Sequence, residues 1–163
     1  MISTEAVAYV FGGPIAPDVS GIVRFKPYRD GTMVEVKING LPGYKKGEDG
    51  ESPIGPFGFH IHNSGSCAIG DSSNPFLGAG SHYNPDKQPH GNHAGDLPVL
   101  FSNHGTAIMN FFTDKFQVND VIGKAVVIHQ NPDDYRTEPA GNSGKRIACG
   151  LITKVVESGR SYK

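Results

Sequence analysis

Hydrophobic residues recur at every second position, or in short unbroken runs, along most of this chain. In the run TMVEVKI, for example, Val34, Val36 and Ile38 alternate with charged residues, as in an antiparallel strand with one buried face. No segment sustains a helical period over ten residues, so the pattern predicts an all-β fold, either a sandwich or a barrel. The expected strands are 6–11, 19–25, 32–38, 57–62, 106–112, 124–129 and 147–156.

Gly and Pro, with polar residues, mark the connections between these runs as loops. The loop 63–97 carries several histidines, the loop 130–146 carries many charged residues, and 40–56 reads as a surface connection. No internal repeat or linker divides the chain, and we therefore expect a single domain over residues 1–163, a length that can bury its own core. Long loops on a rigid β scaffold are common places for functional residues.

Charge and hydropathy exclude several classes of partner. The 15 basic and 16 acidic side chains give a formal charge of −1, which argues against nucleic acid as a partner. No run approaches the about 20 consecutive apolar residues that span a bilayer, so no membrane segment is expected. The N-terminus has Glu5 and no basic residue before its short apolar run, which reads as a strand rather than a signal peptide and predicts a cytoplasmic protein.

Histidine is the unusual feature of the composition, with seven residues against two cysteines. His60 and His62 stand two apart in an expected strand, so both imidazoles project from one face, as two ligands of one metal ion would. His129 ends another strand and could bring a third ligand to that face. The alternative reading is a pair of surface histidines on an edge strand and a packed or solvent-facing His129.

The loop segment SHYNPDKQPHGNHAGD adds His82, His90, His93 and Asp96. Three imidazoles and one carboxylate make a tetrahedral zinc set, and a closed set of four protein ligands indicates a structural or electrostatic zinc rather than a hydrolytic one. The alternative is a histidine-rich loop without metal.

Together, GFHIH, GSHYNP with His90, HAGDL at 93–97, VVIH at 126–129 and GNSGKRIACGLI resemble the copper/zinc superoxide dismutase family, in matching order over nearly the whole chain. The resemblance implies a Greek-key, immunoglobulin-like β-sandwich or flattened barrel of about eight antiparallel strands with two long functional loops. It also implies copper and zinc as cofactors, the superoxide anion as substrate, a homodimer, and a copper chaperone as partner. The activity would convert superoxide to oxygen and hydrogen peroxide by alternate reduction and reoxidation of the copper.

The resemblance assigns roles residue by residue. The implied copper ligands are His60, His62, His82 and His129, and the implied zinc ligands are His82, His90, His93 and Asp96, with His82 bridging the two metals. Asp133 resembles the carboxylate that hydrogen-bonds His60 and His90, with Asp134 as the competing choice. Arg146 would receive superoxide beside the copper, so that Arg146 and His82 are the catalytic residues. Cys67 and Cys149 resemble the family's disulfide, against the alternative of two reduced thiols in a cytosolic chain.

The chain departs from the family pattern in its loops. His90 and His93 are only three residues apart, and Pro139 and Ala140 stand where many relatives have Lys and Thr, which leaves electrostatic steering mainly to Arg146, with Lys145 and Arg136 as further candidates. A non-enzymatic copper/zinc-binding protein of the same fold, for metal buffering or sensing, is the alternative function. A cupin is disfavoured because no glutamate follows His62 within 63–70, and a hydrolytic zinc site because Ser64 and Gly65 replace its last ligands.

Overall fold

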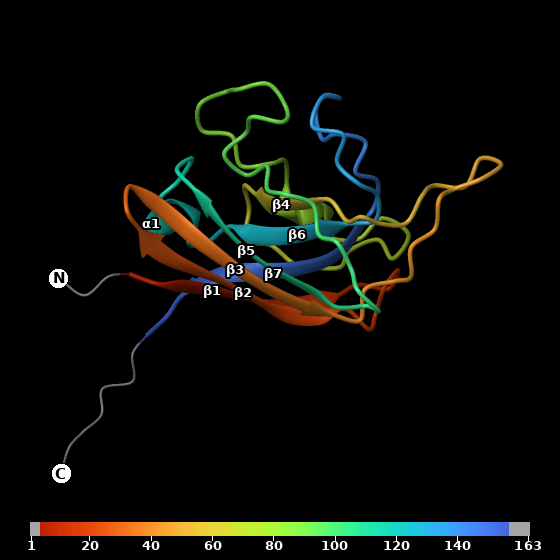
Figure 1. The fold of residues 1–163 in the computed structure, drawn as a ribbon, viewed down its shortest axis with the longest axis horizontal. Coiled ribbons are helices and arrows are strands. Elements are labelled where there is room, and N and C mark those ends of the chain that lie inside the picture. The colour runs from red at the N-terminus through yellow and green to blue at the C-terminus, as the bar shows by residue number, and fades with distance from the viewer. Residues whose placement is uncertain (1–3, 157–163) are drawn as a thin grey trace, which may run out of the picture.

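The computed structural model describes residues 4–156, which form one curled antiparallel sheet (Figure 1). Its strands are β1 (Ala6–Gly12), β2 (Ser20–Tyr28), β3 (Gly31–Asn39), β4 (Phe59–His62), β5 (Ala107–Thr113), β6 (Ala125–His129) and β7 (Arg146–Lys154). The only helical turns in this range are η1 (Leu77–Ala79) and α1 (Val118–Val121). All seven expected strands are present, which confirms the all-β prediction. No helix among the described residues is long and apolar enough to cross a membrane.

The strand order is β4-β6-β7-β1-β2-β3-β5, so the neighbours β3 and β5, and β4 and β6, are not consecutive in the chain. These crossovers give the Greek-key connectivity that the family resemblance implies. Where about eight strands were expected, seven are regular. The segment 95–100 runs beside the free edge of β4, where Asp96 forms an isolated bridge with His60, and Leu100 forms another with Phe57, just before this strand.

The core lies inside the curl, because side chains alternate across each strand. In β3, Val34, Val36 and Ile38 are fully buried while Lys37 is exposed, as the sequence pattern predicted. Side chains of the two strands that end the sheet order, β4 and β5, belong to this one apolar cluster.

The strand β6 is buried at all five positions because both of its faces are covered. Val126 and Ile128 face the main core, whereas Ala125 and Val127 pack with Phe76 under the loop 63–80. A disulfide between Cys67 and Cys149 ties this loop to β7, which confirms the expected pairing.

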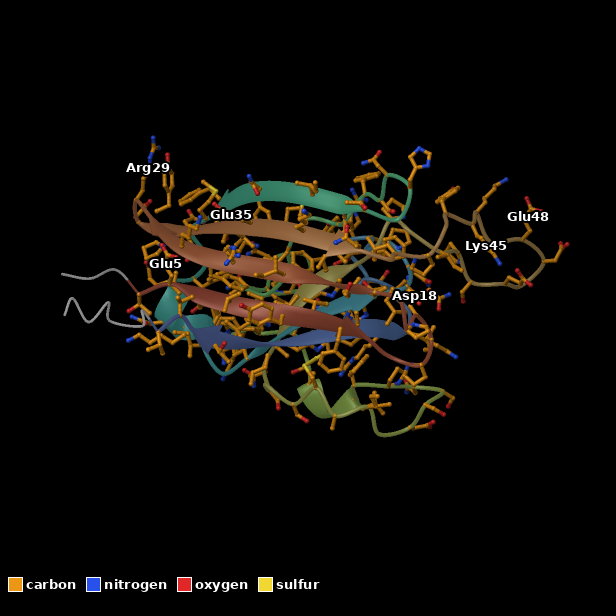
Figure 2. The ribbon with its side chains drawn as sticks, turned by 90° about the horizontal axis from the view of Figure 1, so that it is seen from below. Glu5, Asp18, Arg29, Glu35, Lys45 and Glu48 are labelled. Carbon is orange, nitrogen blue, oxygen red and sulfur yellow. A yellow bond between two sulfur atoms is a disulfide. The ribbon has the colours of Figure 1, made fainter. Side chains whose placement is uncertain are left out.

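The segment 82–97 and the loop 130–146 both project from the same side of the sheet, above β4 and β6 in Figure 1. The connection 40–58 instead extends from one end of the sheet, where Figure 2 labels Lys45 and Glu48. The scaffold therefore places the two polar loops side by side over its shortest strands.

Candidate metal centre

Two neighbouring strands position the first three histidines. His60 and His62 lie on β4, and Ile61 between them points into the main core. His129 ends the adjacent β6, where its amide donates to the carbonyl oxygen of Gly58 at 2.8 Å. Strand alternation therefore sends all three imidazoles to the side that carries the loops.

The free edge of β4 brings in the loop residues. The amide of Tyr83 donates to the carbonyl of Ile61 at 2.8 Å, and isolated bridges pair His82 with His62 and Asp96 with His60. Because the loop pairs with β4 at both places, it returns His82 and Asp96 to the imidazoles of the strand.

The short link between His90 and His93 closes as a tight turn around one carboxylate. Asp96 Oδ2 accepts the backbone N–H of Gly91 at 2.8 Å and that of His93 at 3.0 Å. Gly91 has φ of +85°, a conformation that only glycine adopts without strain. These bonds turn the two rings toward Asp96, with their centroids 5.2 Å apart. The contraction relative to the family pattern is thus accommodated by local backbone geometry.

The histidines and carboxylates gather in two adjoining groups, in each of which the potential ligand atoms lie within 4.8 Å of one another. One group comprises His60, His62, His82 and His129, and the other comprises His82, His90, His93 and Asp96. His82 belongs to both, with its Nδ1 2.8 Å from Asp96 Oδ1. The structure therefore brings together every metal-ligating residue that the sequence proposed, in the two sets proposed.

Unpartnered buried nitrogens test whether a metal ion fits these groups. His60 Nδ1, His82 Nε2, His90 Nδ1 and His93 Nδ1 are buried with no hydrogen-bond partner within residues 4–156. The last two lie 3.4 and 3.3 Å from Asp96 oxygens, too poorly aligned for hydrogen bonds. Each unmade hydrogen bond of this kind costs about 1–3 kcal/mol. Cations shared among these nitrogens and the carboxylate would remove that cost, and imidazole suits both copper and zinc.

Asp133 connects the two groups from the loop 130–146. Its Oδ2 lies 2.6 Å from His60 Nε2 and its Oδ1 lies 2.8 Å from His90 Nε2. These bonds fix both rings with Nδ1 facing the respective group. Asp134 also lies near His90, but its carboxylate accepts instead from the Thr137 hydroxyl and the amides of Arg136 and Thr137 within its own loop. Between the two candidates, the structure places Asp133 at the histidines.

The backbone carbonyl of Gly80 accepts hydrogen bonds from two side chains of the site, a role that nothing in the sequence indicated. It accepts from His62 Nδ1 at 2.8 Å and from the Arg146 guanidinium at 2.6 Å. Arg146 also donates to the carbonyl of Phe76 at 2.7 Å. A backbone acceptor thus fixes the His62 tautomer, leaving Nε2 for a ligand, and places Arg146 beside it.

Gly141 is a second position whose role the sequence did not show. Its φ is +64°, and a side-chain Cβ there would collide with Asp133 Oδ1 and His90 Nε2. The loop backbone therefore approaches the Asp133 bridge as closely as only glycine permits.

A cleft of about 420 Å³ opens onto only one of the two groups. Its floor includes His62, His82 and His129, with Arg146 at the side, whereas His90, His93 and Asp96 do not line it. Leu77, Pro139 and Ala140 form part of its mouth, and Lys145 and Arg136 lie outside its lining. One group is therefore accessible to a small molecule and the other is closed.

Burial keeps three histidines of the accessible group neutral, namely His60, His62 and His129. It lowers the pKa of His60 to about 4 against the opposing hydrogen bond from Asp133, and it holds the pKa values of His62 and His129 well below the usual range. Burial acts to raise the pKa of Asp96, yet the His82 hydrogen bond and the three nearby histidines lower it to about 2. Neutral imidazoles and an ionised carboxylate are the forms that bind metal ions.

The sequence model for copper/zinc superoxide dismutase matches residues 19–152. The chain belongs to the copper/zinc superoxide dismutase family. It is 34% identical over 154 residues to a superoxide dismutase [Cu-Zn] of Deinococcus radiodurans, with 84% of this chain and 79% of the relative covered. It is 35% identical to an extracellular superoxide dismutase [Cu-Zn] of Drosophila melanogaster, covering 91% and 84%. The solved structure of the Cu/Zn superoxide dismutase from Brucella abortus superposes with a TM-score of 0.71 at 27% identity, covering 90% of this chain and 98% of that one.

Family membership confirms the resemblance read from the histidine motifs and the expected fold. It also gives copper and zinc as the family's metals, and the two histidine groups suit such a pair.

Proposed function

We propose that this chain is a superoxide dismutase that converts two superoxide anions and two protons to oxygen and hydrogen peroxide. The observation that carries this proposal is the pair of ligand groups that share His82, one open to a cleft beside Arg146 and the other closed. A redox metal needs access to substrate, whereas a supporting metal does not.

The open group would hold copper through His60, His62, His82 and His129, and the closed group would hold zinc through His82, His90, His93 and Asp96. Bound copper supplies the reversible one-electron chemistry that dismutation requires. Asp133 orients His60 and His90 through its two oxygens, so one carboxylate sets ring geometry on both sides.

Arg146 and His82 would act on the substrate. Arg146 is half-buried at the cleft, and two carbonyl oxygens fix its guanidinium. Its permanent positive charge can therefore attract and bind a small anion in the cleft. His82 Nε2 faces the open group with no partner among the described residues, so this atom can hold a proton and donate it to the product.

The same scaffold could serve as a metal-buffering protein, and one experiment separates the two functions. We expect the purified chain to bind about one copper and one zinc and to dismutate superoxide. Arg146→Ala should lower the rate at limiting superoxide about tenfold or more, with metal content unchanged, because the anion loses its charged partner. Stoichiometric copper without activity would support the buffering protein, and an undiminished rate in Arg146→Ala would refute the role of Arg146.

Two partners and a compartment complete the proposal. The exposed apolar side chains Tyr9, Phe11 and Leu151 on the outer face of β1 and β7 favour a homodimer, which sedimentation analysis of the purified protein would test.

Copper delivery by a chaperone predicts a lower copper content when the chain is produced in cells that lack one. We expect the cytoplasm as the compartment, and cell fractionation would test this against the oxidising compartment in which structural disulfides usually persist.

A further inference from the structure

Two residues of the loop 130–146 hold the chain around His90 and Asp96 without contacting any candidate metal position. They are Tyr135 and Glu138, and neither was singled out in the sequence. Their partners are backbone groups at the two ends of the segment that supplies the closed group.

Glu138 holds the beginning of that segment. Its Oε1 accepts the backbone N–H of His90 at 2.7 Å. The same loop holds the His90 ring through Asp133, so His90 is fixed at both its backbone and its side chain. A ring fixed in this way presents Nδ1 to Asp96 before any ion binds.

Tyr135 holds the end of the segment. Its hydroxyl oxygen accepts the amide of Val99 at 2.8 Å, and the hydroxyl donates to the carbonyl of Leu97, 3.2 Å away, directly after Asp96. Its own amide donates to Asp133 Oδ1 at 2.6 Å. Tyr135 thus links the carboxylate that orients His90 to the backbone that carries Asp96.

The backbone at Tyr135 supports a specific role. Its φ is +55°, a region that few residues other than Gly, Asn and Asp occupy, and which persists only where surrounding contacts enforce it. The Tyr135 carbonyl also packs against Gly91 so closely that a Cβ at position 91 would collide with it. The tight turn between His90 and His93 therefore fits against this part of the loop 130–146.

We propose that Tyr135 and Glu138 are positioning residues for zinc, which clamp the short 90–96 segment in its metal-binding geometry. The inference rests on the proposed function, because it takes His90, His93 and Asp96 as zinc ligands. A segment held in place in advance loses less conformational freedom when an ion binds, so the clamp raises zinc affinity.

The test uses metal-free protein and competition for zinc with a chromophoric chelator. Tyr135→Phe keeps the ring and removes the hydroxyl, Glu138→Ala removes the acceptor, and Glu138→Gln restores an acceptor. We expect the first two to raise the zinc Kd about tenfold or more, the range found for groups that orient metal ligands, and the third to stay within about threefold. Tyr44→Phe and Glu48→Ala are matched controls at exposed positions of the connection 40–58.

Two further measurements separate positioning from general stabilisation. Visible absorption of cobalt bound in place of zinc should change in Tyr135→Phe and Glu138→Ala, while copper affinity and the metal-free unfolding transition stay close to those of the parent. Unchanged zinc affinity in both variants would overturn the clamp, and so would a parallel loss of copper affinity and stability. A parent chain that binds no zinc would overturn the proposed function itself, which is a distinct result.

Discussion

Single hydrogen-bonding groups decide which nitrogen of each histidine faces the metal groups. Asp133 is hydrogen-bonded to Nε2 of His60 and of His90, whereas the Gly80 carbonyl is hydrogen-bonded to Nδ1 of His62. The ligating atom is therefore set by the partner of the opposite ring nitrogen rather than by the histidine itself. For this reason, substitution of a residue that is not itself a metal ligand should still change metal affinity.

Asp133→Asn tests this dependence at the residue scale. The amide can accept one hydrogen bond but cannot accept from both rings, so copper and zinc affinities should each fall about 10–100-fold. Competition titrations of the metal-free protein measure both constants. Asp86→Asn, an exposed carboxylate in the same polar region, should leave them unchanged. Equal affinities in parent and Asp133→Asn would show that the rings are oriented by other groups.

At the scale of elements, β4 organises the site although it has only four residues. One edge pairs with β6, which supplies His129, and the other receives the loop that returns His82 and Asp96. The loop 63–80 completes the arrangement, since its carbonyls at Phe76 and Gly80 fix Arg146. The disulfide from Cys67 to β7 anchors this loop at its beginning.

Removing the disulfide should destabilise the fold and loosen Arg146. The bond joins residues 82 positions apart, so Cys67→Ser should lower the free energy of unfolding by about 4 kcal/mol in the chain-entropy account. Urea denaturation of the metal-free protein measures this change, with Ala68→Ser as the matched control. A loss below about 1 kcal/mol would mean that the packing of Phe76 and Val127 holds the loop without the bond.

At the scale of the whole molecule, the curled sheet buries six histidine side chains in a single polar cluster above its core (His60, His62, His82, His90, His93 and His129). In the metal-free protein, burial keeps the imidazoles of His60, His62 and His129 neutral over a pH range in which they would be charged in the unfolded chain. Folding is thereby coupled to pH.

The sign of this coupling follows from the His60 pKa, which is about 4 in the folded chain against about 6.5 when unfolded. Between these values the unfolded state binds more protons, so stability is lost as the pH falls. From pH 7 to pH 5, His60 alone should remove about 2 kcal/mol of unfolding free energy, and His62 and His129 act in the same direction. Urea titrations at pH 7 and pH 5 measure this change in unfolding free energy. His104→Gln, at an exposed turn position, is the control and should show the same change. An unfolding free energy that stays constant between pH 7 and pH 5 would contradict the prediction.

The strands, the family and the candidate ligands could all be predicted from the amino-acid sequence alone. Alternation such as that of Val34, Val36 and Ile38 fixes which strand face is buried, and this is a local property. The histidine motifs, together with Asp96, also indicated every residue that the two groups contain. The choice between Asp133 and Asp134 needed the folded chain, because only its hydrogen bonds show that Asp133 contacts His60 and His90 whereas Asp134 bonds within its own loop. The tertiary structure alone revealed Gly80, Tyr135 and Glu138, since a contact between a loop and a distant backbone group leaves no periodic signal in the sequence.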